Sequence, residues 1–328
     1  MKILKTTLIV PSNSSHESLN FFFENMITWT SLPKEIILIN TNKSKKLNID
    51  SLYKNFLNKK KILIKFLHYP NFFPGAARNI GLKIASNKII SFLDVGTHAS
   101  KDWLENGYNQ LKNNKHLISW GYTYYLTTSK KDEIIRASTY GAKPLTTLPG
   151  SIVNKKVFNI VGCFIGNIRA GEDAEWRHRV DLHNVKTCVN NKIVVYQNLL
   201  GVSYLEILKK WFRNYSFSRK LSYLNNNREA YFLSFSLILI ILAFNWNPLF
   251  TNWGTPGYEN ETTYIPHITK ITMLTLFLFY AFIRAIYIPI KKGIDIGFLL
   301  KFNILKILIF SFCIDITKLI SFFYSRFK

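Results

Sequence analysis

The chain has 328 residues, enough for a soluble core of about 200 residues plus a further part. It carries 43 Lys and Arg against 19 Asp and Glu, a net charge of +24 that attracts polyanions such as phosphorylated ligands or an anionic membrane surface. No basic recognition helix, zinc-ligand spacing or RNA-binding aromatic motif accompanies this charge, so we predict no nucleic-acid partner. The three cysteines lie too far apart in the sequence to indicate a disulfide framework or a structural zinc site.

Short apolar runs alternate with helix-like spans over the first 200 residues or so. Strands are expected at 7–11, 35–40, 62–69, 89–95 and 117–126, and helices at 17–29 and 75–86. This alternation predicts an α/β fold with a largely parallel sheet and crossover helices. In such a sheet, ligands bind beyond the carboxyl ends of the strands.

Two long apolar runs follow in the second half. Residues 231–250 carry no charge over 20 residues, which is enough to cross a hydrocarbon core of about 30 Å. Residues 271–290 carry only Arg284, which can reach the interface from near the end of a span. The flanks are rich in Lys and Arg, and the connection at 251–267 has none, so the positive-inside bias predicts two spans with cytoplasmic flanks and an outside loop. Two buried core helices are the alternative.

Charged residues interrupt the C-terminal tail, residues 291–328. They leave no uncharged stretch longer than eight residues. This pattern favours an amphipathic or membrane-associated helix at the cytoplasmic face. A third span stays open as an alternative.

Residues 72–97, FFPGAARNIGLKIASNKIISFLDVGT, predict a glycine-containing turn, a helix that carries Arg78 and Asn79, and a strand that ends at Asp94. A carboxylate at the end of such a strand can accept ribose hydroxyls or hold a divalent cation. An aspartate in an ordinary turn is the alternative interpretation.

A second charged stretch, AGEDAEWRHRV at 170–180, places three carboxylates within four positions and three cations directly after them. Glu172 and Asp173 are adjacent and project in different directions, so they are not expected to act as a symmetric pair. The alternative is a charged helix start, because the helix dipole favours acids in the first turn.

Four segments occur in order along the chain: TTLIVPSNSS, EIILINTNKS, GAARNIGLKIASNKIISFLD and GEDAEWRHRV. With these segments the chain resembles family 2 glycosyltransferases of the GT-A fold over roughly residues 5–215. Members of that family move a sugar from a nucleotide diphosphate to an acceptor hydroxyl or phosphate, usually with inversion. The resemblance implies a GT-A catalytic domain at 1–205, a basic neck at 206–230, two transmembrane helices at 231–290 and the tail at 291–328.

The resemblance assigns donor-side roles by position. Pro11 would border the nucleotide at the end of the first strand, and Asn40 falls where the family usually has an aspartate that contacts the base. Arg78 and Asn79 match the family's RN beside the donor, and Asp94 matches the first aspartate of its DxD motif.

The resemblance also assigns catalytic and acceptor roles. Asp173 matches the base that takes the proton of the acceptor hydroxyl, with Glu172 beside it. Glu172 and Glu175 would orient the base, bind acceptor hydroxyls or pair with the arginines. Arg177 would contact phosphate or pair with the acids. Trp211, in KKWFRNY, sits where some membrane-bound members place a tryptophan near the acceptor.

The donor motifs depart from the family pattern in two places. The DxD motif reads Asp94-Val95-Gly96, and Asn40 replaces an acid, so both changes remove negative charge from the donor site. Asp94 could still hold Mg²⁺ or Mn²⁺ with waters and diphosphate oxygens, and His98 is a conceivable further ligand. Neutralisation of the diphosphate by Arg and Lys is the metal-free alternative.

The expected function is inverting glycosyl transfer from a nucleotide sugar to a lipid-linked or membrane glycan acceptor. A multi-pass attachment to the inner (cytoplasmic) membrane, with the catalytic domain in the cytoplasm, would raise the local acceptor concentration. Cell-envelope polysaccharide biosynthesis is the setting that the resemblance implies. Two alternatives stay open: a polyprenyl-phosphate glycosyltransferase, whose acceptor is already ionised, and a GT-A module that binds without catalysis.

Overall fold

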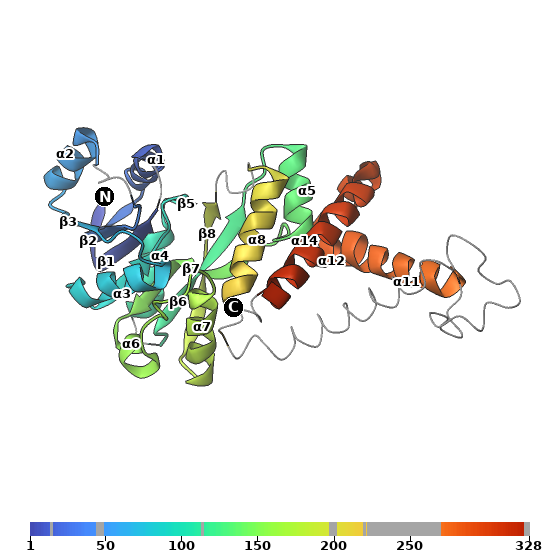
Figure 1. Ribbon diagram of the computed structural model, residues 1–328. Helices are drawn as coiled ribbons and strands as arrows, with labels where there is room; N and C mark the ends of the chain where they lie inside the picture. Colours follow the sequence, from blue (N-terminus) through green and yellow to red (C-terminus); the bar gives the residue numbers. More distant parts are fainter. Residues whose placement is uncertain are drawn as a thin grey trace, which may run out of the picture. The chain divides into compact units, whose positions relative to one another are not determined.

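The computed structural model describes residues 1–13, 16–43, 49–112, 115–196, 202–218, 221 and 270–324. They belong to two compact units, whose helices and strands are labelled in Figure 1. Unit 1 comprises residues 1–132 and 143–202, and unit 2 comprises residues 133–142 and 203–328. The expected span at 231–250 and the loop at 251–267 lie outside the described residues.

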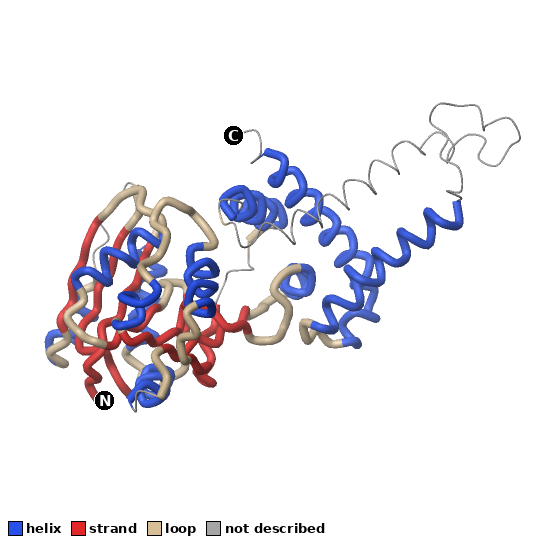
Figure 2. Tube along the Cα trace, turned by 90° about the horizontal axis from the view of Figure 1, so that it is seen from below, coloured by secondary structure: helices blue, strands red, loops and turns tan. Residues whose placement is uncertain are grey.

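Unit 1 is built on one mixed sheet of eight strands, drawn in red in Figure 2. The strands are β1 (Lys2–Ser12), β2 (Ser31–Asn40), β3 (Leu63–His68), β4 (Ile89–Phe92), β5 (Thr97–Ala99), β6 (Ile118–Tyr125), β7 (Leu145–Asn154) and β8 (Thr187–Tyr196). Their order in the sheet is β3-β2-β1-β4-β7-β6-β8-β5. The first four strands in this order are parallel, β7 runs antiparallel to both of its neighbours, and β5 runs antiparallel to β8.

Apolar side chains alternate along β1 and so build two cores, one on each face of the sheet. Leu8 and Val10 pack with α1 (His16–Met26), α2 (Ser51–Lys59) and α4 (Trp103–Lys112). Ile9 packs with α3 (Pro74–Ile84), α6 (Lys156–Val161) and α7 (Glu172–Leu182). The prediction of an α/β fold with crossover helices is thereby confirmed.

Unit 2 is helical. One part of it, residues 133–142, lies between strands β6 and β7 of unit 1 in the sequence. Its helices are the end of α5 (Lys130–Ser138), then α8 (Tyr204–Ser218), α11 (Lys270–Phe282), the π-helical turn η3 (Ile283–Tyr287), α12 (Ile288–Lys291), α13 (Ile296–Phe298), the π-helical turn η4 (Leu299–Asn303) and α14 (Ile304–Tyr324). Ile134 and Ala137 of α5 share a core with Ala285, Leu299 and Ile307.

Two hydrogen bonds also hold residues 133–142 against the helices of unit 2. The Nζ of Lys292 donates to the carbonyl of Thr139, and the backbone N–H of Ala142 donates to the carbonyl of Lys292 at 2.9 Å. Residues 133–142 therefore complete the helical unit, although they precede it by some distance in the sequence.

Within the described residues, one helix is long and apolar enough to cross a membrane, Leu274–Lys291. It corresponds to the expected run at 271–290 and comprises most of α11 with η3 and α12. Arg284 in this helix pairs with Asp315 of α14, Nε to Oδ2 at 2.7 Å. The tail contains α14, a continuous helix of 21 residues, and the expected place of this helix at the cytoplasmic face of a membrane stays a prediction.

Candidate active site

Arg78 joins three of the sequence motifs in unit 1. It lies on α3 with 5% of its surface exposed. One guanidinium nitrogen donates to Glu172 Oε1 at 2.7 Å, and the other terminal nitrogen donates to Asp94 Oδ1 at 3.2 Å. The helix of the RN motif, the turn after β4 and the first turn of α7 therefore meet at one guanidinium.

Glycines allow this close approach. A Cβ on Gly75, in the first turn of α3, would lie 2.2 Å from the carbonyl oxygen of Ile165, in the loop before α7. Gly171 precedes α7 with a φ of +91°, a conformation that residues with a side chain rarely adopt. The three acids of AGEDAEWRHRV then occupy the first turn of α7, where the helix dipole stabilises negative charge.

Burial separates the two adjacent acids of α7. Glu172 is 5% exposed, and burial raises the pKa of its carboxyl although the Arg78 charge opposes this shift. Burial alone would lower the pKa of Arg78, but Asp94, Glu172 and Asp173 together raise it, so the guanidinium stays charged. Asp173 is partly exposed, and its Oδ1 accepts from the N–H of Ala174 at 2.8 Å. Glu172 is thus the buried partner of Arg78, and Asp173 is the more accessible acid.

Asp94 is held from two sides. Its Oδ2 accepts from the hydroxyl of Tyr196 at 2.9 Å, while Oδ1 accepts from Arg78. Tyr196 ends β8 and stacks on Tyr125 of β6, with ring centroids 5.2 Å apart. Tyr196 does not stand out in the sequence, because its contact with Asp94 joins residues 102 positions apart.

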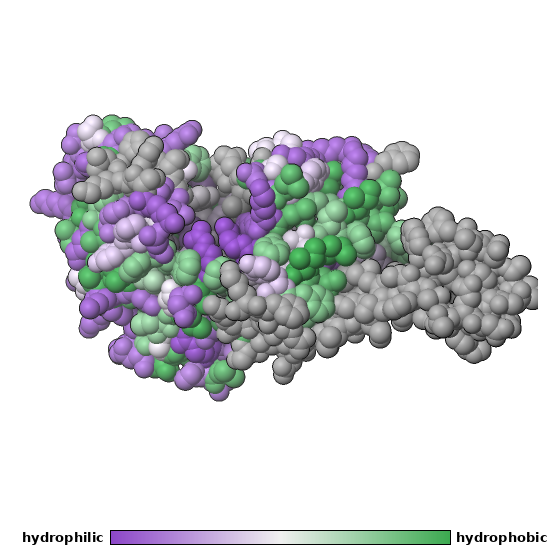
Figure 3. All heavy atoms as spheres, in the orientation of Figure 1, coloured by the Kyte–Doolittle hydropathy of each residue, from purple (hydrophilic) through white to green (hydrophobic). Residues whose placement is uncertain are grey.

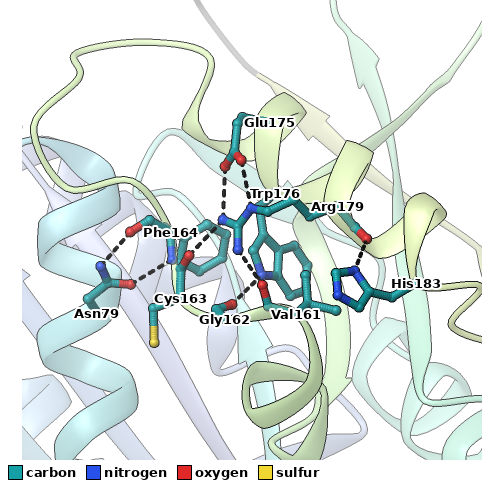
Figure 4. Close-up of polar contacts among 9 residues, drawn as sticks. All are labelled: Asn79, Val161, Gly162, Cys163, Phe164, Glu175, Trp176, Arg179 and His183. Atoms are coloured by element: carbon teal, nitrogen blue, oxygen red, sulfur yellow. Dashed lines mark hydrogen bonds and ion pairs between the residues drawn. The ribbon is translucent and has the colours of Figure 1, made fainter. Parts of the chain in front are cut away.

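Asn79 contacts the loop before α7 (Figure 4). Its Nδ2 donates to the carbonyl of Phe164 at 2.8 Å, and its Oδ1 accepts from the N–H of Phe164 at 3.0 Å. Both halves of the amide are therefore engaged in positioning the chain just ahead of the GED motif. The donor role that the resemblance assigns to Asn79 remains a prediction.

Glu175 pairs with Arg179 one turn further along α7, Oε1 to Nε at 2.6 Å (Figure 4). Arg179 also donates to the carbonyls of Val161 and Cys163, the second at 2.7 Å. Trp176 adds a hydrogen bond from Nε1 to the carbonyl of Gly162 at 2.9 Å. These contacts hold α7 against the end of α6. Glu175 takes part in them through its ion pair with Arg179.

The remaining predicted residues of unit 1 lie at strand ends or beside them. Pro11 of β1 is in register with Ile39, and Asn40 ends β2. Asn40 is fully buried, and its Nδ2 lies 3.2 Å from Nδ1 of His68 on β3. The carboxyl ends of β1, β2 and β3 therefore lie side by side, which is the place where α/β sheets bind ligands.

Arg177 lies on the side of α7 that faces β6 and β7. Its guanidinium donates to the carbonyl of Thr146 at 3.1 Å and lies over the ring of Trp120, 5.4 Å from the centroid. Trp211 belongs to unit 2, where its ring lies 6.0 Å from Tyr140 and 5.9 Å from Tyr215.

The set of side chains that could act as metal ligands is small. No group of three or more His, Cys, Asp or Glu suited to a metal ion occurs in the described part of the chain. Asp94 has both oxygens in hydrogen bonds, and a Cβ at Gly96 would meet nothing within 4 Å. His98 lies on β5; burial lowers its pKa, and its Nδ1 has no partner among the described residues. An ion at Asp94 would therefore have to be held mainly by a diphosphate and waters, and the metal roles assigned to Asp94 and His98 stay predictions.

The sequence profile of glycosyl transferase family 2 matches residues 7–173, just over half of the chain. The chain belongs to glycosyl transferase family 2. The matched part begins on β1 and ends at Asp173, so it includes every motif that meets at Arg78. The predicted family membership is thereby confirmed.

Solved structures resemble this family 2 glycosyltransferase at low sequence identity. A mannosyltransferase from Pyrobaculum calidifontis, PcManGT in complex with GDP-Man and Mn²⁺, has a TM-score of 0.53 at 10% identity and covers 90% of this chain and 85% of its own. TarS 1–349 of S. aureus, in complex with UDP-GlcNAc, has a TM-score of 0.44 at 15% identity. That match covers 66% of each chain, less than two thirds of the TarS fragment. No curated protein is a significant match in sequence.

Proposed function

We propose that this family 2 glycosyltransferase transfers a sugar from a nucleotide diphosphate to an acceptor hydroxyl, with inversion at the anomeric carbon. One observation carries the proposal: Arg78 contacts both Asp94 and Glu172. That contact supports a single site made of the turn after β4 and the acid pair of α7. Inverting transfer needs these two parts together, because the proton leaves the acceptor while the diphosphate departs from the sugar.

Asp173 acts as the base in this proposal. It takes the proton of the acceptor hydroxyl as the new bond to the anomeric carbon forms and the bond to the diphosphate oxygen breaks. Its partial exposure leaves it open to an acceptor, whereas Glu172 is buried against Arg78. Glu172 and Arg78 act as positioning residues, which fix α7 and orient Asp94.

The donor diphosphate would lie near Asp94. A divalent ion there would offset the negative charge of the departing diphosphate, and Asp94 would be its protein ligand. PcManGT binds GDP-Man and Mn²⁺, so a guanosine diphosphate sugar with Mn²⁺ is the first donor to test. A uridine diphosphate sugar, as bound by TarS, is the second.

A membrane-linked acceptor fits the composition of unit 2. The helix Leu274–Lys291 supports attachment to a membrane, and the +24 net charge favours an anionic cytoplasmic surface. Attachment keeps the enzyme beside a lipid-linked glycan or glycolipid. We propose polysaccharide synthesis at the cytoplasmic face of the inner membrane on this basis.

The test is Asp173→Asn, with Asp181→Asn as the matched control, because Asp181 is exposed on the same helix. Transfer of labelled sugar into membranes of the producing cells would be measured beside nucleotide binding. We expect Asp173→Asn to lower transfer about a hundredfold or more with nucleotide binding retained, as for loss of a general base, and the control to keep its activity. If Asp173→Asn retains full transfer, the base assignment is wrong, and an acceptor that is already ionised, such as a polyprenyl phosphate, replaces the hydroxyl.

A further inference from the structure

Unit 2 contains a buried ionic cluster that the proposed reaction does not use. Asp315 of α14 has a side chain that is 2% exposed. Arg284 contacts both of its oxygens, Nε to Oδ2 at 2.7 Å and a terminal nitrogen to Oδ1 at 3.1 Å. The hydroxyl of Tyr280 donates to Oδ2 at 3.0 Å, and Nζ of Lys318 lies 3.5 Å from Oδ1. These four residues are the Asp315 cluster.

The Asp315 cluster has more positive than negative charge. One carboxylate faces two cations, and Arg284 takes the shorter, two-point contact with it. Burial lowers the pKa of Lys318 to about 8, and the charges of Arg284 and Lys292 add to this shift while Asp315 opposes it. Removing a cation from water without a full partner is unfavourable, so an anion beside Lys318 would stabilise the cluster.

Aromatic rings surround the Lys318 ammonium on the side of α8. The amine lies 5.0 Å from the ring centroid of Trp211 and 5.4 Å from that of Tyr215. Ring faces attract a cation, but they carry no formal negative charge. The Nε1 of Trp211 is itself buried and has no acceptor among the described residues. An N–H donor without an acceptor and an incompletely neutralised ammonium therefore lie close together.

We propose that Lys318 and the indole N–H of Trp211 bind the phosphate of a membrane lipid. A phosphate provides both of the missing features, a negative charge and several acceptor oxygens. Basic sites between membrane-associated helices are suited to anionic lipid headgroups. The proposal goes beyond the proposed function, because it concerns a site for a lipid phosphate and not the transfer of the sugar.

The surface of unit 2 favours a lipid over free phosphate. Leu305, Ile309 and Phe312 are between 42% and 63% exposed and follow one face of α14 at positions i, i+4 and i+7. Phe277 and Phe279 of α11 are 57% and 62% exposed. Figure 3 shows hydrophobic residues gathered over α14 and its neighbouring helices. Leu305, Ile309 and Phe312 lie on the face of α14 away from Lys318, and their exposure indicates that unit 2 contacts lipid acyl chains. A lipid headgroup is therefore the source of phosphate that this unit would meet.

The experiment is calorimetric binding to the full chain in a neutral detergent. The three probes are a short-chain phosphatidic acid, a phosphatidylcholine with the same chains, and inorganic phosphate. Lys318→Met removes the charge, Lys318→Arg retains it, and Lys306→Met is the matched control, because Lys306 is exposed on the same helix.

We expect phosphatidic acid to bind most tightly and Lys318→Met to weaken it about tenfold or more, the loss expected for one charge-assisted hydrogen bond. Lys318→Arg should retain binding, and Lys306→Met should leave it unchanged. Lys318→Met should also keep or raise the apparent melting temperature without lipid, because it leaves Asp315 and Arg284 as a balanced pair.

Three results would overturn the proposal. Equal binding of phosphatidylcholine would mean that the acyl chains alone are recognised, and equal binding of inorganic phosphate would exclude a lipid-specific site. Unchanged affinity in Lys318→Met would exclude Lys318 as the ligand. Nucleotide binding in the same preparations tests the site of unit 1 separately, so failure of one proposal is distinguishable from failure of the other.

Discussion

Replacing Arg78 with methionine should destabilise unit 1 strongly, because it leaves the carboxylate of Glu172 buried without its partner. The side chains of Arg78 and Glu172 are each 6% exposed, and their nitrogen and oxygen atoms are 2.7 Å apart. Loss of one member of a buried ion pair costs about 3–5 kcal/mol. The contact between Arg78 and Asp94 adds little, because the Asp94 side chain is 33% exposed and the distance between the two groups is longer, 3.2 Å.

This loss is large beside a total stability of about 5–15 kcal/mol. At roughly 2–4 °C for each kcal/mol in a domain of this size, the apparent melting temperature should fall by about 6–20 °C. Glu172→Gln added to Arg78→Met removes the unpaired charge, so the double variant should melt well above the single one.

The defect should also depend on pH. Burial raises the pKa of Glu172 above its ordinary 4.5, so the folded protein without Arg78 keeps a proton that the unfolded chain releases. The stability of Arg78→Met should therefore fall as the pH rises above about 4.5, and its difference from wild type should be smaller at pH 5 than at pH 8.

Scanning fluorimetry of the detergent-purified proteins at pH 5 and pH 8 measures both effects. Lys83→Met is the matched control, because Lys83 is an exposed cation on the same helix. If Arg78→Met melts within about 2 °C of wild type at pH 8, the buried pair does not hold α3 against α7, and the reasoning fails.

Two further substitutions test the site. Gly75→Ala places a Cβ 2.2 Å from the carbonyl oxygen of Ile165, so it should displace the loop before α7 and lower the free energy of unfolding by about 2 kcal/mol or more in chemical denaturation. Gly96→Ala is the control, because a Cβ there meets nothing within 4 Å, and it should be close to neutral. Equal effects of the two substitutions would refute the steric argument. Tyr196→Phe removes the hydrogen bond to Asp94, so donor nucleotide binding should weaken by about threefold to tenfold in calorimetry, and unchanged affinity would show that Asp94 needs no such support.

The fold could be predicted from local pattern where the strands are apolar and uninterrupted. The segments at 7–11 and 35–40 became β1 and β2, and the helix expected at 75–86 became α3, because Pro74 and Gly75 mark its start. These elements carry their own periodicity, so their burial follows from sequence alone.

β7 was not predicted, because its stability depends on a distant contact. Pro149 and Gly150 interrupt its sequence, and the strand has a register irregularity at this point. β6 and β7 approach each other closely at this point because β6 has Gly121 there, where a Cβ would lie 2.0 Å from the carbonyl oxygen of Pro149. No local pattern in the sequence indicates such a partner.

The candidate site likewise has some residues that the sequence predicts and others that only the fold brings in. The motifs named Arg78, Asp94 and Glu172, and the structure adds that they touch. Tyr196 carries no motif, and its bond to Asp94 joins residues from β8 and the turn after β4, so only the folded chain shows it. The polar sequence of α5 likewise gave no sign that residues 133–142 would complete the helical unit.

The central claim is that unit 1 has a working nucleotide donor site beside Asp94. The most direct measurement is calorimetric binding of UDP, GDP, CDP and dTDP to the detergent-purified protein, each with Mn²⁺ and again with EDTA. We predict that one nucleotide binds selectively, and that EDTA weakens this binding because it removes the ion that we propose at Asp94 and the diphosphate. Binding of no nucleotide under either condition would contradict the account, and the meeting of the motifs at Arg78 would then need another explanation.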